Sequence, residues 1–319
     1  MRKPTSMVAL VHQYLDYRHK LGFLLRVEGP QIVAFAEYAD RSKHRGAITT
    51  ELAVRWARLP EKGSPLYHAR RLEVVRCFAR YAAIFDDRTE IPPEKILGQA
   101  HRRMQPHIYS DEEIRQLMEA ASELLPADGL RPRTYTALFG VLASTGLRIS
   151  EALMLRQVDV DFRQSLMRIV ETKFHKSRLV VLHPTVCAQV QAYACFRDRH
   201  RHAERADAFF LSESGRALNY STVRTTFRMI SRRLGWDAHV GRQRPRIYDL
   251  RHTFACHRLL QWYRDGVDVD HAIAALSTYM GHVKVTDTYW YLTGIPDLLQ
   301  IAANRFEHFR HNHEKESRS

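Results

Sequence analysis

The first hundred residues place apolar side chains at helical spacing, and no strand-like alternation interrupts the pattern. Three stretches carry it most clearly: residues 5–21, 29–44 and 64–85. A serine or threonine stands before the apolar run of the first stretch and can cap the helix that the run predicts. We therefore expect residues 1–97 to fold as a small bundle of helices.

The helix predicted over residues 64–85 combines an apolar stripe with basic side chains. Leu72, Val75 and Phe78 belong to the stripe, which should pack inside the bundle. The helix also carries Arg70, Arg71, Arg76 and Arg80. The pattern predicts that these arginines form a basic outer face.

A break in the pattern follows this bundle. Prolines, a glycine and a polar, basic stretch are typical of a connection, and we expect residues 98–108 to be a linker. Helical spacing resumes in residues 109–125 and again near 131–144. Ser110 or Asp111 can cap the first of these helices, and the acidic residues of its first turn suit the helix dipole.

The spacing changes to a period of two after residue 160. Apolar and polar side chains alternate over residues 166–173, and a second run rich in valine and leucine covers 177–184. The polar letters KFHKS between them predict a hairpin turn, and helical patterns return from residue 184 onward. We expect a mainly α fold with a small antiparallel β-sheet. Its parts are a helical domain (1–97), a linker (98–108) and a C-terminal α+β domain (109–319).

Composition narrows the class of protein. Hydrophobic residues make up 45% of the 319 residues and charged residues 26%, which is typical of a globular protein. No apolar run approaches the length that crosses a bilayer, and the N-terminus lacks a secretion signal, so we expect a cytoplasmic protein without membrane association. The 4 cysteines form no CxxC pair and the 18 histidines show no metal spacing, so we expect free thiols and no metal.

Charge adds a class of partner. The net charge is +14, from 49 Lys and Arg against 35 Asp and Glu. Residues 1–107 contribute 19 against 11, and residues 108–319 contribute 30 against 24. A basic surface on both domains suits a phosphate polymer held from two sides, although excess charge can also serve solubility alone.

Two segments of the second domain place arginines at unusual positions. In TGLRISE (145–151), Arg148 stands at a turn that opens a helix, where a guanidinium and helix amides can meet an anion. In LRHTFA (250–255), Arg251 interrupts the apolar stripe of a helix. A salt bridge to Asp249 or Glu151 would be a purely structural explanation for that arginine.

A third segment, GHVKVTDTYWY (281–291), places Tyr291 nine residues after His282. Each segment alone is weak, but their order and spacing resemble the motifs of the tyrosine recombinase (phage integrase) family. The resemblance covers residues 108–310 through motifs, and residues 5–100 only through the helical, basic character expected of that family's core-binding domain. It implies a core-binding domain followed by a catalytic integrase domain.

The resemblance also implies roles for individual residues. Arg148 and Arg251 match the two arginines that clamp the scissile phosphate, which fits the charge that develops on its non-bridging oxygens. Lys173 matches the hairpin lysine that protonates the leaving 5′ oxygen, and Lys176 is a neighbouring candidate. His282 matches the histidine that supports the phosphate.

The nucleophile implied by the resemblance is Tyr291. Tyr289 lies about 200° away on a helix and cannot face the same phosphate, so Tyr289 and Trp290 are expected to pack or stack. Tyr248 stands where the family usually has a histidine. A phenol can donate to a phosphate but is a poor base at neutral pH, so Tyr248 could position the phosphate while His252 or water takes the proton.

The function that the resemblance implies is site-specific cleavage and rejoining of double-stranded DNA through a covalent 3′-phosphotyrosine, without cofactor or metal. We expect a tetramer on DNA and association with the nucleoid. Because the first helix begins at once, a transposon or chromosomal recombinase is favoured over an arm-binding phage integrase. Two alternatives stay open: a catalytically impaired DNA-binding protein of the same fold, and DNA relaxation of the type IB topoisomerase kind.

Overall fold

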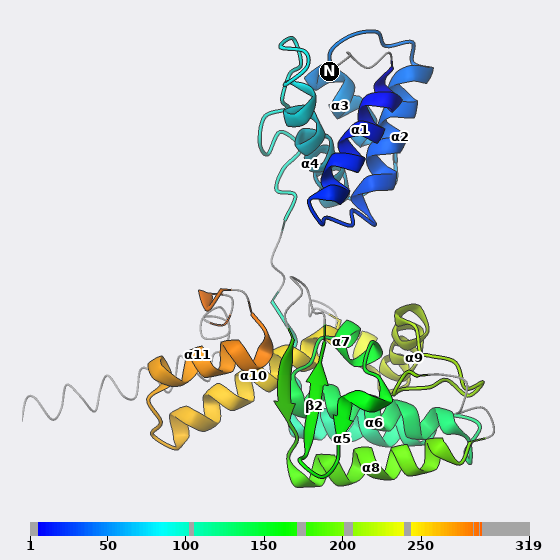
Figure 1. Cartoon of the computed structure of the whole chain (residues 1–319), viewed down its shortest axis with the longest axis vertical. Helices are drawn as coiled ribbons and strands as arrows, with labels where there is room; N and C mark the ends of the chain where they lie inside the picture. Colours follow the sequence, from blue (N-terminus) through cyan, green and yellow to red (C-terminus); the bar gives the residue numbers. More distant parts are fainter. Residues whose placement is uncertain are drawn as a thin grey trace, which may run out of the picture. The chain divides into compact units, whose positions relative to one another are not determined.

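The structure is a computed structural model of the whole chain (Figure 1). It describes residues 6–101, 105–170, 177–200, 207–238, 244–282, 284–286 and 288. Contacts between residues divide the chain into two compact units, Met1–Met104 and Gln105–Ser319. Each unit has a hydrophobic core of its own.

The N-terminal unit is a bundle of helices. Its described helices are α1 (Met7–Lys20), α2 (Glu28–Arg41), α3 (Thr50–Arg58) and α4 (Pro65–Ala82). The side chains of Ser6, Thr49 and Ser64 each accept a hydrogen bond from a backbone amide in the first turn of α1, α3 and α4. The sequence pattern missed α3, since nine residues are too short a window for a helical period.

Aromatic rings fill the centre of this bundle. The ring of Phe35 meets Trp56 with centroids 5.5 Å apart and Phe78 with centroids 6.5 Å apart, both edge to face. The guanidinium carbon of Arg71 lies 3.7 Å from the centroid of the Trp56 ring. An arginine from α4 therefore covers the indole at the rim of the core.

The arginines of α4 do not all face outward. Arg70 and Arg80 are exposed, as the sequence predicts. Arg76 is only 6% exposed, and its guanidinium pairs with Glu73 at 2.8 Å. The prediction of a continuous basic face is therefore wrong at Arg76, which a carboxylate on the same helix holds inside the unit.

The C-terminal unit is mainly helical with a small sheet, as predicted. Its helices are α5 (Asp111–Ser122), α6 (Leu130–Thr145), α7 (Ile149–Leu153), α8 (Pro184–Asp198), α9 (Tyr220–Arg233), α10 (Ile247–Arg264) and α11 (Val269–Met280). Helix α6 is buried on most of its surface, and α5, α8 and α10 pack against it. Ser110 and Glu113 form a reciprocal capping box at the start of α5, which settles the choice of cap residue.

The sheet has three antiparallel strands in the order β1 (Val160–Asp161), β2 (Leu166–Ile169) and β3 (Arg178–Val181). Met167 lies opposite Val180, and both are buried in the core of the unit. The predicted hairpin of two strands is confirmed as β2 and β3, although both strands are shorter than the alternation suggested. Strand β1 was not predicted, because two residues carry no readable alternation.

A second cluster of apolar side chains joins α10 to α11. Leu259 on α10 and Leu276 and Met280 on α11 are among its buried members. Helix α11 ends at Gly281, which takes a left-handed conformation with φ 68°. This packing fixes the position of the residues that follow α11, where His282 lies.

Candidate active site

Arg148 stands where one helix ends and the next begins. Helix α6 ends at Gly146, which has φ 63°, a conformation that favours glycine. A larger residue is excluded there, because an added Cβ would lie 2.5 Å from the ring of Phe254 on α10. Arg148 follows as the residue before α7, and its side chain is 24% exposed. The turn therefore presents the guanidinium at an accessible edge of the unit.

Arg251 lies on α10 and is 1% exposed. Its guanidinium donates from Nη1 to the carbonyl oxygen of Gly146 at 2.7 Å and from Nη2 to the carbonyl oxygen of Met280 at 2.7 Å. Both carbonyls belong to C-terminal helix ends, at α6 and α11, where backbone dipoles carry partial negative charge. Asp249 and Glu151 were the carboxylates considered from the sequence. Asp249 pairs with Arg246 at 2.7 Å, and Glu151 pairs with Arg148 at 2.7 Å.

Arg148 also donates a hydrogen bond to the end of α11. Arg148 donates from Nη1 to Glu151 at 2.7 Å and from Nη2 to the carbonyl oxygen of Gly281 at 2.9 Å. Gly281 is the neighbour of Met280, which accepts from Arg251. The structure therefore brings together the turn at Arg148, helix α10 and the end of α11, three stretches that are far apart in the sequence.

Glu151 also accepts hydrogen bonds from a second arginine, Arg178. Its carboxylate receives both terminal nitrogens of Arg178, at 3.0 and 2.8 Å, as well as the backbone amide of Arg148 at 3.0 Å. Burial alone would raise the pKa of this carboxyl, but the hydrogen bonds and charge of Arg178 and the hydrogen bonds of Arg148 outweigh burial and hold the pKa below its usual range. Glu151 is therefore ionised at neutral pH.

His282 directly follows the left-handed glycine that ends α11. Its backbone amide donates to the carbonyl oxygen of Ser277 at 2.9 Å. Its Nδ1 lies 2.7 Å from Oγ1 of Thr288, which is fully buried. If Thr288 donates to Nδ1, the imidazole carries its proton on Nε2 and can donate to an anion from that nitrogen.

Tyr248 and His252 lie one turn apart on α10 and differ in exposure. Tyr248 is 46% exposed, whereas His252 is 8% exposed. Their rings meet edge to face with centroids 4.9 Å apart. Burial lowers the pKa of His252 to about 4, so its imidazole is neutral and a weak base at neutral pH. The structure therefore argues against His252 as the group that takes the proton of the nucleophile.

Five further residues considered from the sequence lie outside the described part of the chain. They are Lys173 and Lys176 between β2 and β3, and Tyr289, Trp290 and Tyr291 after α11. Strands β2 and β3 flank the segment with the two lysines, and β3 contacts α11. The base of the hairpin therefore belongs to the same part of the unit as the arginines.

Sequence reasoning missed Arg178. It opens β3 and is 12% exposed, and besides Glu151 it donates from Nε to the carbonyl oxygen of Tyr279 at 2.8 Å. No periodicity identifies such a residue, because a polar side chain on a strand has the same sequence pattern as one that faces solvent. The available signal was a basic residue beside the hairpin lysines, which is too general to identify it.

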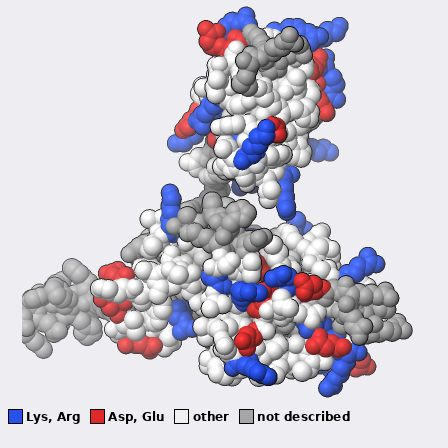
Figure 2. Space-filling view, viewed as in Figure 1, with Lys and Arg blue, Asp and Glu red and all other residues white. Residues whose placement is uncertain are grey.

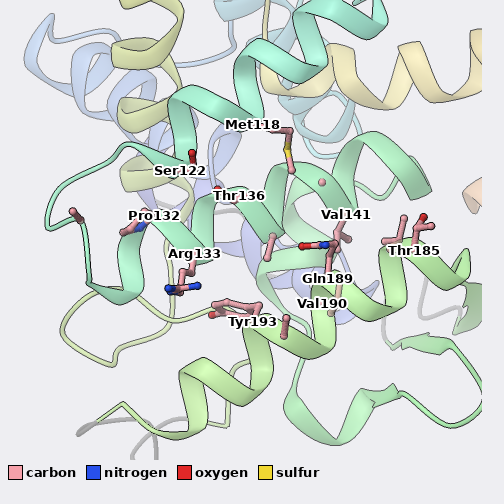
Figure 3. Close-up of a pocket in the computed structure, with 15 residues that line it drawn as sticks. Met118, Ser122, Pro132, Arg133, Thr136, Val141, Thr185, Gln189, Val190 and Tyr193 are labelled. Carbon is pink, nitrogen blue, oxygen red and sulfur yellow. The ribbon is translucent and has the colours of Figure 1, made fainter.

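The described residues contain no group of three His, Cys, Asp or Glu that could hold a metal ion. No described helix is long and apolar enough to cross a membrane. Helices α5, α6 and α8 enclose a pocket of about 590 Å³, lined among others by Met118, Arg133 and Tyr193 (Figure 3). No residue considered above for the active site lines this pocket.

Basic side chains are spread over both units. Figure 2 shows Lys and Arg on the visible face of each, with Asp and Glu between them. In the C-terminal unit, α9 carries four exposed arginines (Arg224, Arg228, Arg232 and Arg233), whereas Val223 and Phe227 are among its buried residues. Among the described residues, most basic side chains therefore lie on the surface of each unit, apart from arginines such as Arg76 and Arg251 that are buried.

Comparison with known proteins points to one family. Residues 108–294 match the model of the family described as "Phage integrase family". Over 303 residues the chain is 41% identical to a protein of Sinorhizobium fredii named as an integrase/recombinase, y4rB, covering 93% of this chain and 96% of that one. It is 29% identical over 226 residues to tyrosine recombinase XerC of Chlamydia caviae, covering 70% of this chain and 65% of the relative.

A solved structure shares the fold. The Tn1549 transposon integrase, in complex with transposon right end DNA, superposes with a TM-score of 0.69 at 16% identity. The match covers 95% of this chain and 99% of that chain. At this identity the likeness concerns the arrangement of the elements, and residue roles depend on the geometry described above.

Proposed function

This chain belongs to the phage integrase family and is a tyrosine-type site-specific recombinase, and from that premise we propose how its residues carry out the reaction. Arg148 and Arg251 clamp the scissile phosphate of double-stranded DNA. Tyr291 attacks the phosphorus and forms a 3′-phosphotyrosine link. Because this link resembles in energy the phosphodiester that it replaces, rejoining needs no nucleotide cofactor.

The observation that supports this proposal best is the meeting of the two arginines at the end of α11. Arg251 is anchored on the carbonyls of Gly146 and Met280, both at 2.7 Å, and Arg148 on that of Gly281 at 2.9 Å. Attack on a phosphodiester builds negative charge on the non-bridging oxygens. Two guanidinium groups fixed before the reaction can stabilise that charge without reorganising.

The other proposed roles follow from position. Lys173, in the hairpin between β2 and β3, protonates the leaving 5′ oxygen, with Lys176 as the neighbouring candidate. His282 donates a hydrogen bond to the phosphate. Tyr248 is exposed and its ring is held against His252, so we assign it a hydrogen bond to the phosphate rather than the role of base. Water is then the acceptor of the proton from Tyr291.

We assign DNA binding to both parts of the chain. Residues 1–97 form a core-binding domain, 98–108 a linker and 109–319 the catalytic domain. Each part carries excess positive charge, 19 against 11 before residue 108 and 30 against 24 after it. Recombination exchanges four strands and each tyrosine cuts one, so we propose a tetramer in which each subunit holds one half-site.

A suicide substrate tests the central step. DNA of the native target site, nicked next to the scissile phosphate, loses a short strand after cleavage and traps the covalent adduct. Wild type and Tyr289→Phe should form the adduct, whereas Tyr291→Phe should bind the same DNA with normal affinity and form none. An adduct with Tyr291→Phe would show that another residue is the nucleophile.

The suicide substrate, together with a plasmid relaxation assay and an assay of strand exchange between two sites, separates the alternatives. Wild-type protein that binds the site but never forms an adduct would be a DNA-binding protein without catalysis. Protein that relaxes supercoiled plasmid of any sequence, yet joins no strands between two sites, would act as a type IB topoisomerase. Adduct formation together with strand exchange between two target sites would support recombination.

A further inference from the structure

Arg178 occupies a position between two parts of the candidate active site. It opens β3, and its side chain is 12% exposed. Its terminal nitrogens donate to both oxygens of Glu151, at 3.0 and 2.8 Å, while its Nε donates to the carbonyl oxygen of Tyr279 at 2.8 Å. One guanidinium therefore links the hairpin strand to α7 and to the last turn of α11.

Arg178 and Arg148 share one acceptor, and their other acceptors lie two residues apart at the end of α11. Glu151 accepts Nη1 of Arg148 at 2.7 Å, and the carbonyl oxygen of Gly281, two residues beyond Tyr279, accepts Nη2 at 2.9 Å. Gly281 also packs closely on Arg178, since a Cβ added there would lie 2.8 Å from Nη1 of that arginine. Each described hydrogen bond of the Arg148 guanidinium thus ends on a group that Arg178 contacts or borders.

We propose that Arg178 is a positioning residue for the phosphate clamp, which orients Arg148 without contacting the substrate itself. It fixes the carboxylate of Glu151 and the end of α11 so that the Arg148 guanidinium is oriented before DNA binds. This inference rests on the proposed role of Arg148 in phosphate binding. It adds the first residue of β3 to the group formed by Arg148, Arg251 and the end of α11.

Charge gives Arg178 a second effect on the clamp. Glu151 with Arg148 alone would be a neutral pair, with little attraction for a phosphate. Three arginines (Arg148, Arg178 and Arg251) and one carboxylate sum to +2, from 3 − 1. Without Arg178 the same groups would sum to +1, from 2 − 1, so Arg178 offsets the carboxylate that orients Arg148 and raises the positive charge of the site, which suits a phosphodiester with its single negative charge.

The geometry requires a guanidinium rather than any cation. Arg178 uses two parallel N–H groups on one carboxylate and a third N–H, on Nε, in another direction. A lysine ammonium keeps the charge but cannot reproduce this fork and the contact with Tyr279 together. Arg178→Lys thus removes the orientation of Glu151 and retains the net charge of the site.

The test measures the single-turnover rate of covalent adduct formation on the nicked substrate. Arg178→Lys should bind the DNA within about 2-fold of wild type, since the phosphate contacts are unchanged in number. Its cleavage rate should fall roughly 100-fold, the effect expected when a reacting group is displaced by about 1 Å. Arg168→Lys is the matched control, because Arg168 on the neighbouring strand pairs with a buried carboxylate, Asp159, at 3.0 Å outside the site.

A double substitution distinguishes positioning from a general structural effect. In an Arg148→Ala background, Arg178→Lys should change the remaining rate by less than about 2-fold, because the residue that it positions is gone. An equal loss in both backgrounds would overturn the proposal, as would a wild-type rate for Arg178→Lys or the same loss in Arg168→Lys. If the lysine variant does not fold, Arg178→Gln replaces it; because glutamine also removes the positive charge and should weaken DNA binding, its rates in the two backgrounds are compared at saturating DNA.

The result for the wild-type protein distinguishes a failure of this inference from a failure of the proposed function. If wild type forms no adduct at all, the proposed function fails and the role of Arg178 in it fails too. If wild type forms the adduct and Arg178→Lys forms it equally fast, the function stands and only the positioning role of Arg178 is refuted.

Discussion

Glu151 accepts hydrogen bonds from two arginines of the site, and its replacement by glutamine should destabilise the C-terminal unit. Glutamine has nearly the same shape, so the packing around a side chain that is 5% exposed is kept. One carboxylate oxygen becomes an NH₂ group that can only donate. That group would face the N–H donors of Arg148 or Arg178, which need acceptors.

The magnitude follows from the hydrogen bonds that are lost. The carboxylate accepts four hydrogen bonds, two on each oxygen. Oε1 accepts from Nη1 of Arg148 and Nη1 of Arg178, and Oε2 accepts from the backbone amide of Arg148 and Nη2 of Arg178. Glutamine loses one such pair whichever way it is oriented. Hydrogen bonds to charged groups contribute about 1.5 to 3 kcal/mol each. Because Arg148 is 24% exposed and water can replace part of the loss, we expect the lower end, about 3 kcal/mol.

Urea and thermal unfolding measure this difference in the full-length protein. For a unit of this size, about 3 kcal/mol corresponds to a lowering of Tm by roughly 6 to 12 °C. The effect should depend on pH in a defined direction. The lowered pKa of Glu151 means that its contribution is present above the usual range of a glutamate and is lost as the pH falls through the lowered value. Wild type and Glu151→Gln should therefore become alike in acid.

A surface carboxylate supplies the control. Glu112 pairs with Arg115 at 2.5 Å, but the two side chains are 55% and 57% exposed. Glu112→Gln should leave the free energy of unfolding almost unchanged, since solvent screens such a pair. A loss below about 1 kcal/mol for Glu151→Gln at neutral pH, or a difference that persists in acid, would refute the reasoning about the buried arginine network.

Three further outcomes are expected. Gly281→Ala should lower the free energy of unfolding by about 1 to 2 kcal/mol and slow adduct formation, because Gly281 has φ 68° and borders Arg178; urea unfolding and single-turnover rates measure both effects. Lys173→Ala should cleave normal DNA slowly but a 5′-phosphorothiolate substrate at nearly the wild-type rate, since sulfur leaves without a proton; equal defects on both would favour Lys176. His252→Phe should leave the shape of the pH–rate profile between about pH 5.5 and 8 unchanged, because burial already keeps this histidine neutral; a lost inflection near pH 6.5 would contradict that.

The fold was predictable where long segments repeat one period. The amphipathic spacing of residues 5–21 and 64–85 predicted α1 and α4, and the alternation after residue 160 predicted β2 and β3. The nine residues of α3 and the two of β1 were missed, because their conformation depends on tertiary packing more than on a local pattern. Arg76 was expected to be exposed, but a carboxylate three residues earlier, Glu73, allows its burial.

The site was predictable only as far as motifs reach. TGLRISE, LRHTFA and the GH pair indicated Arg148, Arg251 and His282, and the structure brings their segments together. Arg178 could not be predicted in the same way. Its acceptor Tyr279 lies 101 residues away in the sequence, so its role exists only once β3 and α11 are packed together.

The two arginines that we propose as the phosphate clamp are held by different kinds of partner, and the difference bears on their proposed role. Arg251 donates to the carbonyls of Gly146 and Met280, which orient the guanidinium without cancelling its charge. Arg148 donates to a carboxylate, which orients it more strongly but would cancel its charge if no second cation were present. Arg178 supplies that cation on the same carboxylate. A site that is rigid before DNA arrives and still attracts an anion needs either neutral acceptors or a carboxylate shared by two arginines. The described contacts show the first arrangement at Arg251 and the second at Arg148.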